Sequence, residues 1–407
     1  MAAPTTPTLD FTSDKPPRHR RWVPVSLRMF VAILVILSLA FGWIGAPVCR
    51  KQMAIWDIER IGGIVEVEPT GSPWLREIIG DRKMRALDTV IRVAVSDTDC
   101  TDGSLRMLPA LNDLKYVHFD NSGITDASLR YLKGRLGLKA ITTRGVQITD
   151  AGLENLEECT GLEHLELDRT PVTDAGLMHL AGMTKLRVLC LNGTHINGTG
   201  FSQFERLVSL IRLELNDTHL TGDAFANLSR LSNLQHLTLQ DAQFSDANLA
   251  NLTGPRTLKT LDLGGSTITD AALENLNSLP NLFQLVLNRT DISDAGLIHL
   301  KKLPSLAWLV LDTTSITDAG LADLAELTGL GVLYLGHTQV TDAGLIHLAR
   351  LTNLKILHLE EAQISDAGLA LLEAIPNLKS VNLRGTSVTA EGVAELKRAL
   401  PKLKVSR

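Results

Sequence analysis

The sequence predicts an α/β solenoid in which short strands and short helices alternate along the chain, preceded by one N-terminal transmembrane helix. Three observations carry this prediction. A pattern returns every 24 residues without an insertion, and its leucines first alternate with other residues and then recur three apart. A residue that caps helices marks the same place in every period. A fixed period of this length is typical of a repeat solenoid.

The capping position holds Thr, Ser or Asn in every unit, and such side chains accept a backbone N–H at the start of a helix. Asp follows in ten of the thirteen units, where the helix dipole favours a negative charge, whereas Gly198, Gly222 and Ala390 are the exceptions. Gly lies three residues after the cap in eight units, and we expect its small size to let helix and strand layers approach. The capping positions are Thr101, Thr125, Thr149, Thr173, Asn197, Thr221, Ser245, Thr269, Ser293, Thr317, Thr341, Ser365 and Thr389.

The unit around Thr173 shows how each period is built. Leu165 and Leu167 alternate with other residues, which predicts a short strand with one buried face. Leu177 and Leu180 share one face of a short helix. A second hydroxyl precedes the cap by three residues, and we expect it to bond backbone groups of neighbouring turns in a polar ladder. Its members are Thr98, Ser122, Thr170, Thr194, Thr218, Ser266, Thr290, Thr314, Thr338 and Thr386, with gaps at Val146, Ala242 and Ala362.

This pattern, L-x-x-L-x-L-x-x-T-x-V-T-D-A-G-L over residues 162–177, resembles the leucine-rich repeat family, with Thr where that family has Asn or Cys. The resemblance covers residues 90–401. The I-T-D-A-G-L wording is similar to that of bacterial membrane-anchored repeat proteins of the planctomycete kind, and to the repeats of eukaryotic F-box proteins. The resemblance implies a curved horseshoe with parallel strands on the concave face and short helices on the convex face. It also implies a binding role.

The segment before the repeats predicts export. Residues 1–28 are rich in Pro, Thr and Arg and carry five basic side chains, so we expect a disordered cytoplasmic tail. Residues 29–48 contain no charge, are long enough to span a bilayer, and predict a single-pass signal anchor in the cell (inner) membrane. The positive-inside bias then places the repeats outside, in the periplasm of a bacterium. A signal peptide cleaved after Gly42 and a lipoprotein processed at Cys49 remain alternatives.

The ends of the array must be covered by non-repeating segments. Residues 50–89 predict an N-terminal cap: a helix over 51–61, a strand over 64–67, and a helix from Ser72 to Gly80, with Trp56 and Trp74 as core anchors. A separate binding module is the alternative for this segment. At the other end, residues 391–400 predict a helix and 402–407 a basic tail.

Several functional classes lack support in the sequence. Residues 1–28 hold five basic and two acidic side chains, a net charge of +3. Because the whole chain carries −5, the remaining residues carry −8, which argues against a nucleic-acid-binding surface. The four cysteines show no paired spacing, and the acidic run at 97–103 does not fit a calcium loop. His195 and His219 could share a metal, but no third ligand is evident. We therefore expect no catalytic residue, metal, cofactor or small-molecule substrate.

Side chains that alternate with the strand leucines should form rows on the concave face, about 4.8 Å apart from unit to unit. Units ten to twelve carry an apolar and aromatic patch, and aromatic side chains on an exposed strand face are typical of protein-binding hot spots. The middle units are mildly acidic. The candidate partner-binding residues are Trp308, Val310, Val332, Tyr334, Ile356 and His358 in the patch, and Glu166, Asp168 and Glu214 in the middle. Incidental variation on a solvent-facing sheet is the alternative.

Together these observations predict a membrane-anchored, extracytoplasmic scaffold that binds an unidentified protein or peptide without catalysis, its acidic middle attracting a basic partner. The alternative is a cytosolic F-box-like adaptor that recognises substrates for ubiquitin-dependent degradation. The uncharged segment 29–48 argues against it, as does the lack of an F-box.

Overall fold

The computed structural model describes residues 27–40, 42, 45–97 and 99–407, and the chain divides into two units, 1–49 and 50–407. In the first unit, helix α1 (Leu27–Ala40) covers part of the predicted anchor. No helix among the described residues is long and apolar enough to cross a membrane. The predicted basic tail before residue 27, and residues 41, 43 and 44 of the anchor, lie outside the described residues.

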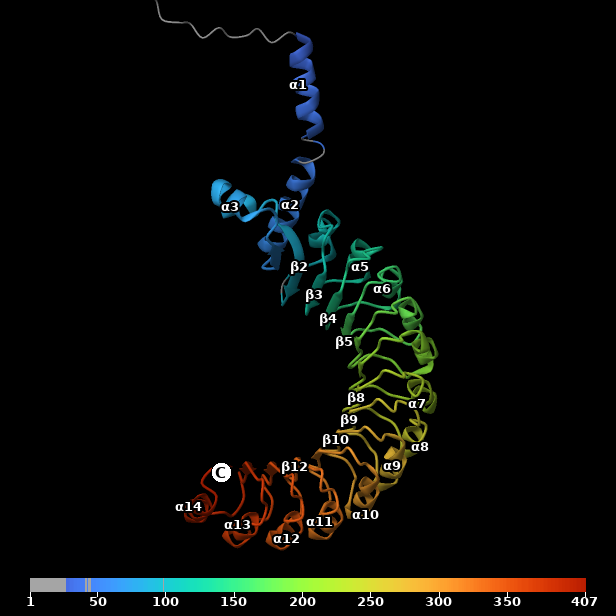
Figure 1. Cartoon of the computed structure of the whole chain (residues 1–407). Helices are drawn as coiled ribbons and strands as arrows, with labels where there is room; N and C mark the ends of the chain where they lie inside the picture. Colours follow the sequence, from blue (N-terminus) through green and yellow to red (C-terminus); the bar gives the residue numbers. More distant parts are fainter. Residues whose placement is uncertain (1–26, 41, 43–44, 98) are drawn as a thin grey trace, which may run out of the picture. The chain divides into compact units, whose positions relative to one another are not determined.

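The second unit is built on one sheet of fifteen strands that follow each other in sequence order (Figure 1). β1 pairs antiparallel with β2, and every later pair is parallel. Leucines occupy the same register from strand to strand, as Leu285 does between Leu261 and Leu309. The strands are β1 (Ile64–Glu68), β2 (Thr89–Ser96), β3 (Tyr116–Asp120), β4 (Ala140–Arg144), β5 (His164–Asp168), β6 (Val188–Cys190), β7 (Arg212–Glu214), β8 (His236–Thr238), β9 (Thr260–Asp262), β10 (Gln284–Val286), β11 (Trp308–Val310), β12 (Val332–Tyr334), β13 (Ile356–His358), β14 (Ser380–Asn382) and β15 (Lys404–Ser406).

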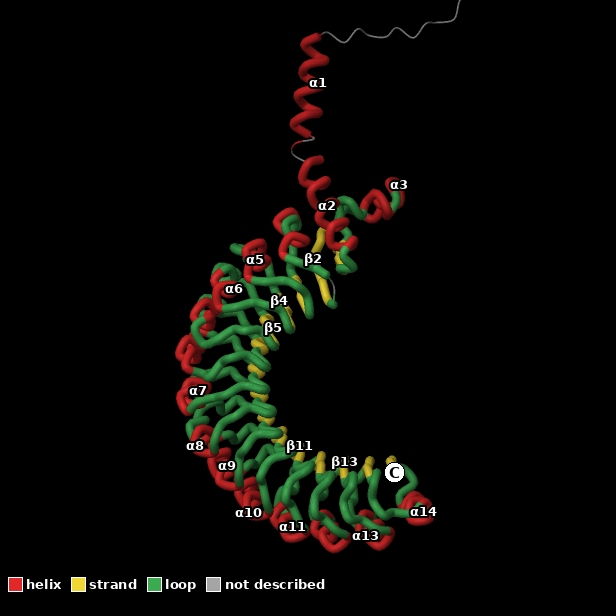
Figure 2. The backbone as a smooth tube through the Cα atoms, turned by 180° about the vertical axis from the view of Figure 1, so that it is seen from behind, coloured by secondary structure: helices red, strands yellow, loops and turns green. Residues whose placement is uncertain are grey.

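Short helices run along the outer side of the curve that residues 50–407 form, and the strands line its inner side (Figure 2). The sequence-based expectation of a horseshoe with concave strands and convex helices is confirmed for this unit. Several units have only a 3₁₀ turn, such as Gly176–Leu180 and Thr199–Arg206. The α-helices of the repeats are α5 (Asp126–Leu129), α6 (Asp150–Glu154), α7 (Gly222–Leu228), α8 (Asp246–Leu249), α9 (Asp270–Glu274), α10 (Asp294–Leu297), α11 (Asp318–Leu324), α12 (Leu345–Leu348), α13 (Asp366–Leu372) and α14 (Ala390–Ala399).

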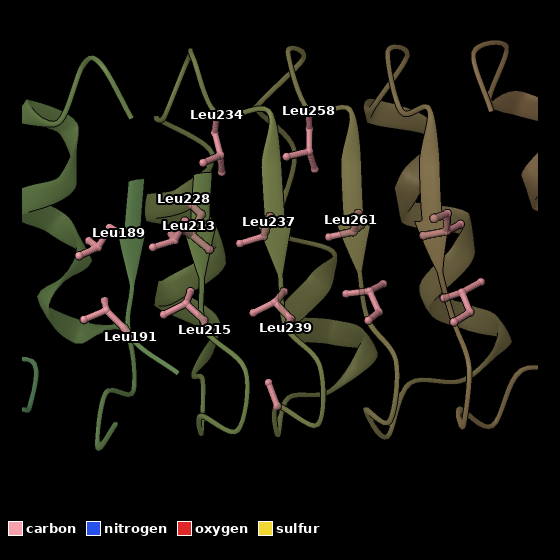
Figure 3. Close-up of a cluster of buried hydrophobic side chains, with 14 of the residues drawn as sticks. Leu189, Leu191, Leu213, Leu215, Leu228, Leu234, Leu237, Leu239, Leu258 and Leu261 are labelled. Atoms are coloured by element: carbon pink, nitrogen blue, oxygen red, sulfur yellow. The ribbon is translucent and has the colours of Figure 1, made fainter. Parts of the chain in front are cut away.

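The core is one continuous column of leucines between strands and helices. Figure 3 shows part of it, in which Leu189, Leu213, Leu237 and Leu261 occupy equivalent places on consecutive strands. Each of these side chains is fully buried. A strand in such an array buries its leucines only against neighbouring units, so stability depends on stacking.

The N-terminal segment covers the first repeat, but not with the expected residues. α2 (Ala46–Arg60) buries Ala54, Ile55 and Ile58, and β1 extends the sheet by one antiparallel strand. Trp56 and Trp74 are 60% and 61% exposed, so their prediction as core anchors is wrong. Trp56 lies on the outer side of α2, where the guanidinium of Arg60 lies 5.0 Å from its ring centroid.

The remaining elements of this segment are α3 (Pro73–Ile79) and α4 (Asp81–Met84). α3 begins with Pro after Ser72 and ends at Gly80, as predicted, although the Ser72 side chain makes no capping bond. The buried carboxylate of Asp88 accepts hydrogen bonds from Arg76 of α3 and from the backbone N–H of Thr70. A buried charge needs such a partner, so this pair ties α3 to the start of β2.

At the C-terminal end, residues 404–406 form the parallel strand β15, where the sequence suggested only a basic tail. Val405 pairs with Val381, which precedes it by one repeat length of 24 residues. Half of a further unit therefore continues the sheet.

The recurring Thr-Asp pair joins neighbouring units. The capping side chains do accept backbone N–H groups, as Thr317 does from Ala319 at 3.2 Å. The aspartate does more than complement a helix dipole, because its carboxylate accepts two hydrogen bonds from the capping residue of the next unit. Asp294 accepts the backbone N–H of Thr317 at 2.9 Å and its hydroxyl at 2.6 Å. The same pair of hydrogen bonds joins the following unit to Asp102, Asp126, Asp150, Asp246, Asp270, Asp318, Asp342 and Asp366.

The glycine after the cap makes room for this carboxylate. A Cβ added at Gly320 would lie 2.2 Å from Oδ1 of Asp294, and at Gly344 2.3 Å from Oδ1 of Asp318. The expectation that this glycine brings helix and strand layers together is therefore wrong in its detail. The close neighbour is the aspartate of the preceding unit.

The second hydroxyl is placed as expected but bonds differently. Thr314 donates to the carbonyl of Leu311, three residues earlier in its own unit, at 2.6 Å. Thr170, Thr194, Thr218, Ser266, Thr290, Thr338 and Thr386 repeat this bond. These hydroxyls therefore close a tight turn within their own units, and the predicted ladder between units is wrong. The buried hydroxyl of Ser122 has no hydrogen-bond partner among the described residues, and Thr98 lies outside them.

Candidate functional site

The strand register places the predicted concave rows side by side. Val310, Tyr334 and His358 are direct partners on β11, β12 and β13, and so are Trp308, Val332 and Ile356. All six are half-buried, because their strand neighbours cover one side and solvent the other. The six patch residues named from the sequence thus lie together on three adjacent strands.

Aromatic rings connect the two rows of this patch. The rings of Trp308 and Tyr334 are nearly parallel, with centroids 6.3 Å apart and planes 8° from each other. The His358 ring lies 3.9 Å from that of Tyr334. The indole Nε1 of Trp308 is buried and has no hydrogen-bond partner among the described residues. Stacked rings hold each other in place, so the patch presents a rigid apolar surface.

Comparison with known proteins agrees with this architecture. A sequence profile described as Leucine Rich repeat matches residues 254–276 and 350–372. The solved structure of an internalin from Listeria monocytogenes aligns with a TM-score of 0.59 and 23% identity, covering 82% of this chain and 92% of that one. The chain thus has the leucine-rich repeat fold, and two of its segments match the sequence profile of that repeat.

Two further solved structures align at lower TM-scores. A repeat protein of this kind from Leptospira interrogans aligns at 0.39, with 15% identity over 74% of this chain and 92% of that one. The ectodomain of a plant receptor kinase from Arabidopsis thaliana, in complex with CASPARIAN STRIP INTEGRITY FACTOR 2, aligns at 0.44, with 18% identity over 78% and 50%. A search of curated proteins found no significant match.

The acidic middle of the leucine-rich repeat array is engaged internally. Arg144 donates to Glu166 at 3.0 Å, and Arg212 forms an ion pair with Glu214 at 3.5 Å. Asp168 is only 6% exposed and accepts two bonds from Asn192, from its backbone N–H at 3.0 Å and its side-chain amide at 3.1 Å. Much of the charge predicted to attract a partner is therefore balanced within the sheet.

Burial and hydrogen bonding act in opposite directions on these carboxyl groups. Burial raises the pKa of Asp168, although the bonds from Asn192 oppose it. For Glu166, the His164 imidazole, whose Nε2 lies 3.9 Å from the carboxylate, is the largest cause of a lowered pKa, with Arg144 contributing against partial burial. Asp168 therefore mainly serves the scaffold, since a buried carboxylate with fixed partners cannot be offered to a ligand.

Two acidic residues beside the patch were missed by the sequence reasoning. Asp312 follows β11 and Glu360 follows β13, and Gly336 lies between them on the unit of Tyr334. A Cβ added at Gly336 would lie 2.9 Å from Oδ1 of Asp312 and 3.5 Å from Cβ of Glu360. The sequence could have indicated them, because they lie two residues after Val310 and His358 and so belong to the next row of the concave face.

No group of three or more His, Cys, Asp or Glu side chains in the described part of the chain is arranged to hold a metal ion. Cys100, Cys159 and Cys190 are buried in the array, whereas Cys49 is exposed. Cys100 thus lies in the core, at the position where most other units have Ile or Val.

Proposed function

We propose that this leucine-rich repeat protein is a membrane-anchored, extracytoplasmic scaffold that binds a protein or peptide on its concave face without catalysing a reaction. The observation that carries the proposal is the stacked patch of Trp308 and Tyr334 on exposed strands of a chain with only 4% aromatic residues. Half-buried aromatic side chains supply large contact areas at low entropic cost, which is why they dominate binding hot spots.

The test is capture of a partner from the host's membrane fraction by the full chain and by the double variant Trp308→Ala, Tyr334→Ala. We expect the wild type to retain a partner that the double variant loses. Met178→Ala with Ile298→Ala is the matched control, since both side chains are apolar, are more than half exposed and belong to the short helices of the convex side. Equal capture by all three proteins would contradict a site on this patch.

The anchoring part of the proposal rests on the uncharged segment 29–48 and the basic residues before it. We expect the full chain to stay with membranes in alkaline carbonate, and its repeats to be digested by protease added outside intact spheroplasts. Protection from that protease would contradict an extracytoplasmic array. A chain lacking residues 29–48 that keeps its activity in the cytosol would favour the adaptor alternative.

A further inference from the structure

The aromatic patch borders two carboxylates that no basic side chain neutralises. Asp312 accepts the backbone N–H of Gly336 at 2.6 Å, and Glu360 accepts the side-chain amide of Asn382 at 3.1 Å. Neither forms an ion pair with Lys or Arg in the part of the chain that the structure describes. Both lie close enough to His358 to act on it electrostatically, and Asp312 acts on Tyr334.

The acidic side chains in the middle of the sheet, by contrast, have basic partners. There, Glu166 and Glu214 each contact an arginine of the same surface. The basic side chains that act electrostatically on Asp312 are the imidazoles of His337 and His358, and burial lowers the pKa of the His358 ring. At neutral pH this ring therefore stays uncharged, and the negative potential beside the patch is not cancelled by it.

We infer that the patch binds a basic side chain, Arg or Lys, of an otherwise apolar segment of the partner, with the cation placed between the aromatic rings of Trp308 and Tyr334 and the carboxylates of Asp312 and Glu360. This inference rests on the proposed binding function and names its partner chemistry. The faces of Trp and Tyr attract cations, and a carboxylate adds charge-assisted hydrogen bonds. Val310, Val332 and Ile356 provide the apolar contact for the neighbouring residues of that segment.

Both carboxylates border the row of Val310, Tyr334 and His358. Asp312 lies two residues after Val310, and Glu360 lies two residues after His358. A basic side chain that contacts this row is therefore close to both carboxylates. Charge complementarity thus selects a cationic ligand over an acidic or neutral one.

The experiment is a positional-scanning library of fluorescent nonapeptides, measured by fluorescence polarisation against the full chain in detergent micelles. We expect one position to select Arg or Lys, flanked by Leu, Ile or Val. Replacing the selected Arg by citrulline, which keeps the shape and removes the charge, should weaken binding about tenfold. The variant Asp312→Asn, Glu360→Gln should lose a similar factor for the Arg peptide and none for the citrulline peptide.

Glu373→Gln with Glu395→Gln is the matched control, because it removes the same charge from exposed positions on convex helices and should leave peptide binding unchanged. Peptides that require Trp308 and Tyr334 but contain no selected basic residue would overturn this inference and leave the proposed function standing. Acidic or purely apolar selected peptides are two such outcomes. If no peptide binds in a way that depends on Trp308 and Tyr334, the proposed concave site fails, and this inference with it.

Discussion

At the scale of the residue, one backbone position in every unit adopts a left-handed conformation. Its φ is 54° at Arg169, 57° at Thr313 and 69° at Gly265, always 24 residues or a multiple of 24 apart. Most side chains disfavour this region because Cβ crowds the following carbonyl, whereas Gly, Asn and Asp tolerate it. The sequence contained this signal, since Gly, Asn or Asp occupies the position in eight of thirteen units, but the more frequent Thr-Asp pattern obscured it.

Thr313 is the one β-branched residue at this position, so its conformation is the most strained of the series. We expect Thr313→Gly to raise the free energy of unfolding by about 1 kcal/mol, because the strain it removes exceeds the entropy that glycine loses on folding. Urea denaturation of the two proteins measures this. The reverse change, Gly265→Thr, should destabilise, because its Cβ would lie 1.9 Å from Oδ1 of Asp241. An unchanged midpoint for Thr313→Gly would show that the turn is unstrained.

At the scale of the element, most of the short helices are held to the next unit by an aspartate. Helices of four to seven residues are too short to be stable alone. The bonds from Asp318 to the N–H and hydroxyl of Thr341, at 2.8 and 2.6 Å, fix the start of the next unit. The sequence predicted the helix starts correctly, but a capping rule describes one helix at a time. It cannot show that the same carboxylate bonds a residue 23 positions later.

Removal of one such carboxylate tests this role. We expect Asp318→Ala to lower the free energy of unfolding by about 1–3 kcal/mol, because two part-buried donors on Thr341 lose their acceptor. Asp223→Ala is the control, since this exposed residue also lies in a first helical turn and would report the dipole effect alone. Chemical denaturation compares the two. Equal losses of unfolding free energy would mean that the helix dipole alone accounts for the effect of both aspartates.

Acid should weaken the same bonds. Hydrogen bonds from the hydroxyl and N–H of Thr389 hold the pKa of Asp366 below its usual value, because they favour the charged form. A lowered folded-state pKa adds stability above the unfolded pKa of about 3.9, and this is lost as pH falls through the folded pKa. We therefore expect the urea midpoints of wild type and Asp366→Ala to differ steadily between pH 5 and 7 and to converge below about pH 4. Glu373→Ala is the control, and its urea midpoint should differ from that of the wild type by the same amount at every pH.

At the scale of the whole molecule, the repeat period was enough to predict the solenoid, its parallel sheet and its leucine core. Burial requires the same residue types in every unit, so a single sequence already contains many copies of that signal. The surface is not constrained in this way. Asp168 and Glu214 looked available in the sequence, and only the sheet register shows that Asn192 contacts both. Trp56 and Trp74 belong to the non-repeating cap, where no second copy existed to show which face is buried.

The array is not uniform along its length, because two units lack the linking aspartate. Gly198 and Gly222 take its place, so Thr221 and Ser245 receive no carboxylate from the unit before them. Aromatic side chains pack together in this stretch, but they supply no hydrogen bond between the units. The rings of Phe201 and Phe204 stack at 4.5 Å, and units outside this stretch have leucines at these places, apart from Val393 in the last unit. Amide hydrogens of units five to seven should therefore exchange fastest among the central repeats, since local opening follows the weakest contacts.

Introducing an aspartate where a unit lacks it tests whether the missing hydrogen bonds cause the faster exchange. Gly222→Asp should slow exchange in units six and seven and stabilise by about 1 kcal/mol, because the new carboxylate can accept hydrogen bonds from Ser245. Its Cβ would lie near only the flexible side-chain amides of Asn248 and Asn251, at 3.2 and 3.8 Å. Gly198→Asp should destabilise instead, because Gly198 has φ of 91° and its Cβ would lie 2.2 Å from that of Ala224. The two substitutions insert the same side chain into equivalent positions of adjacent units. Opposite effects would establish that backbone conformation decides which units lack the aspartate that bonds to the next unit. Equal effects would contradict this explanation.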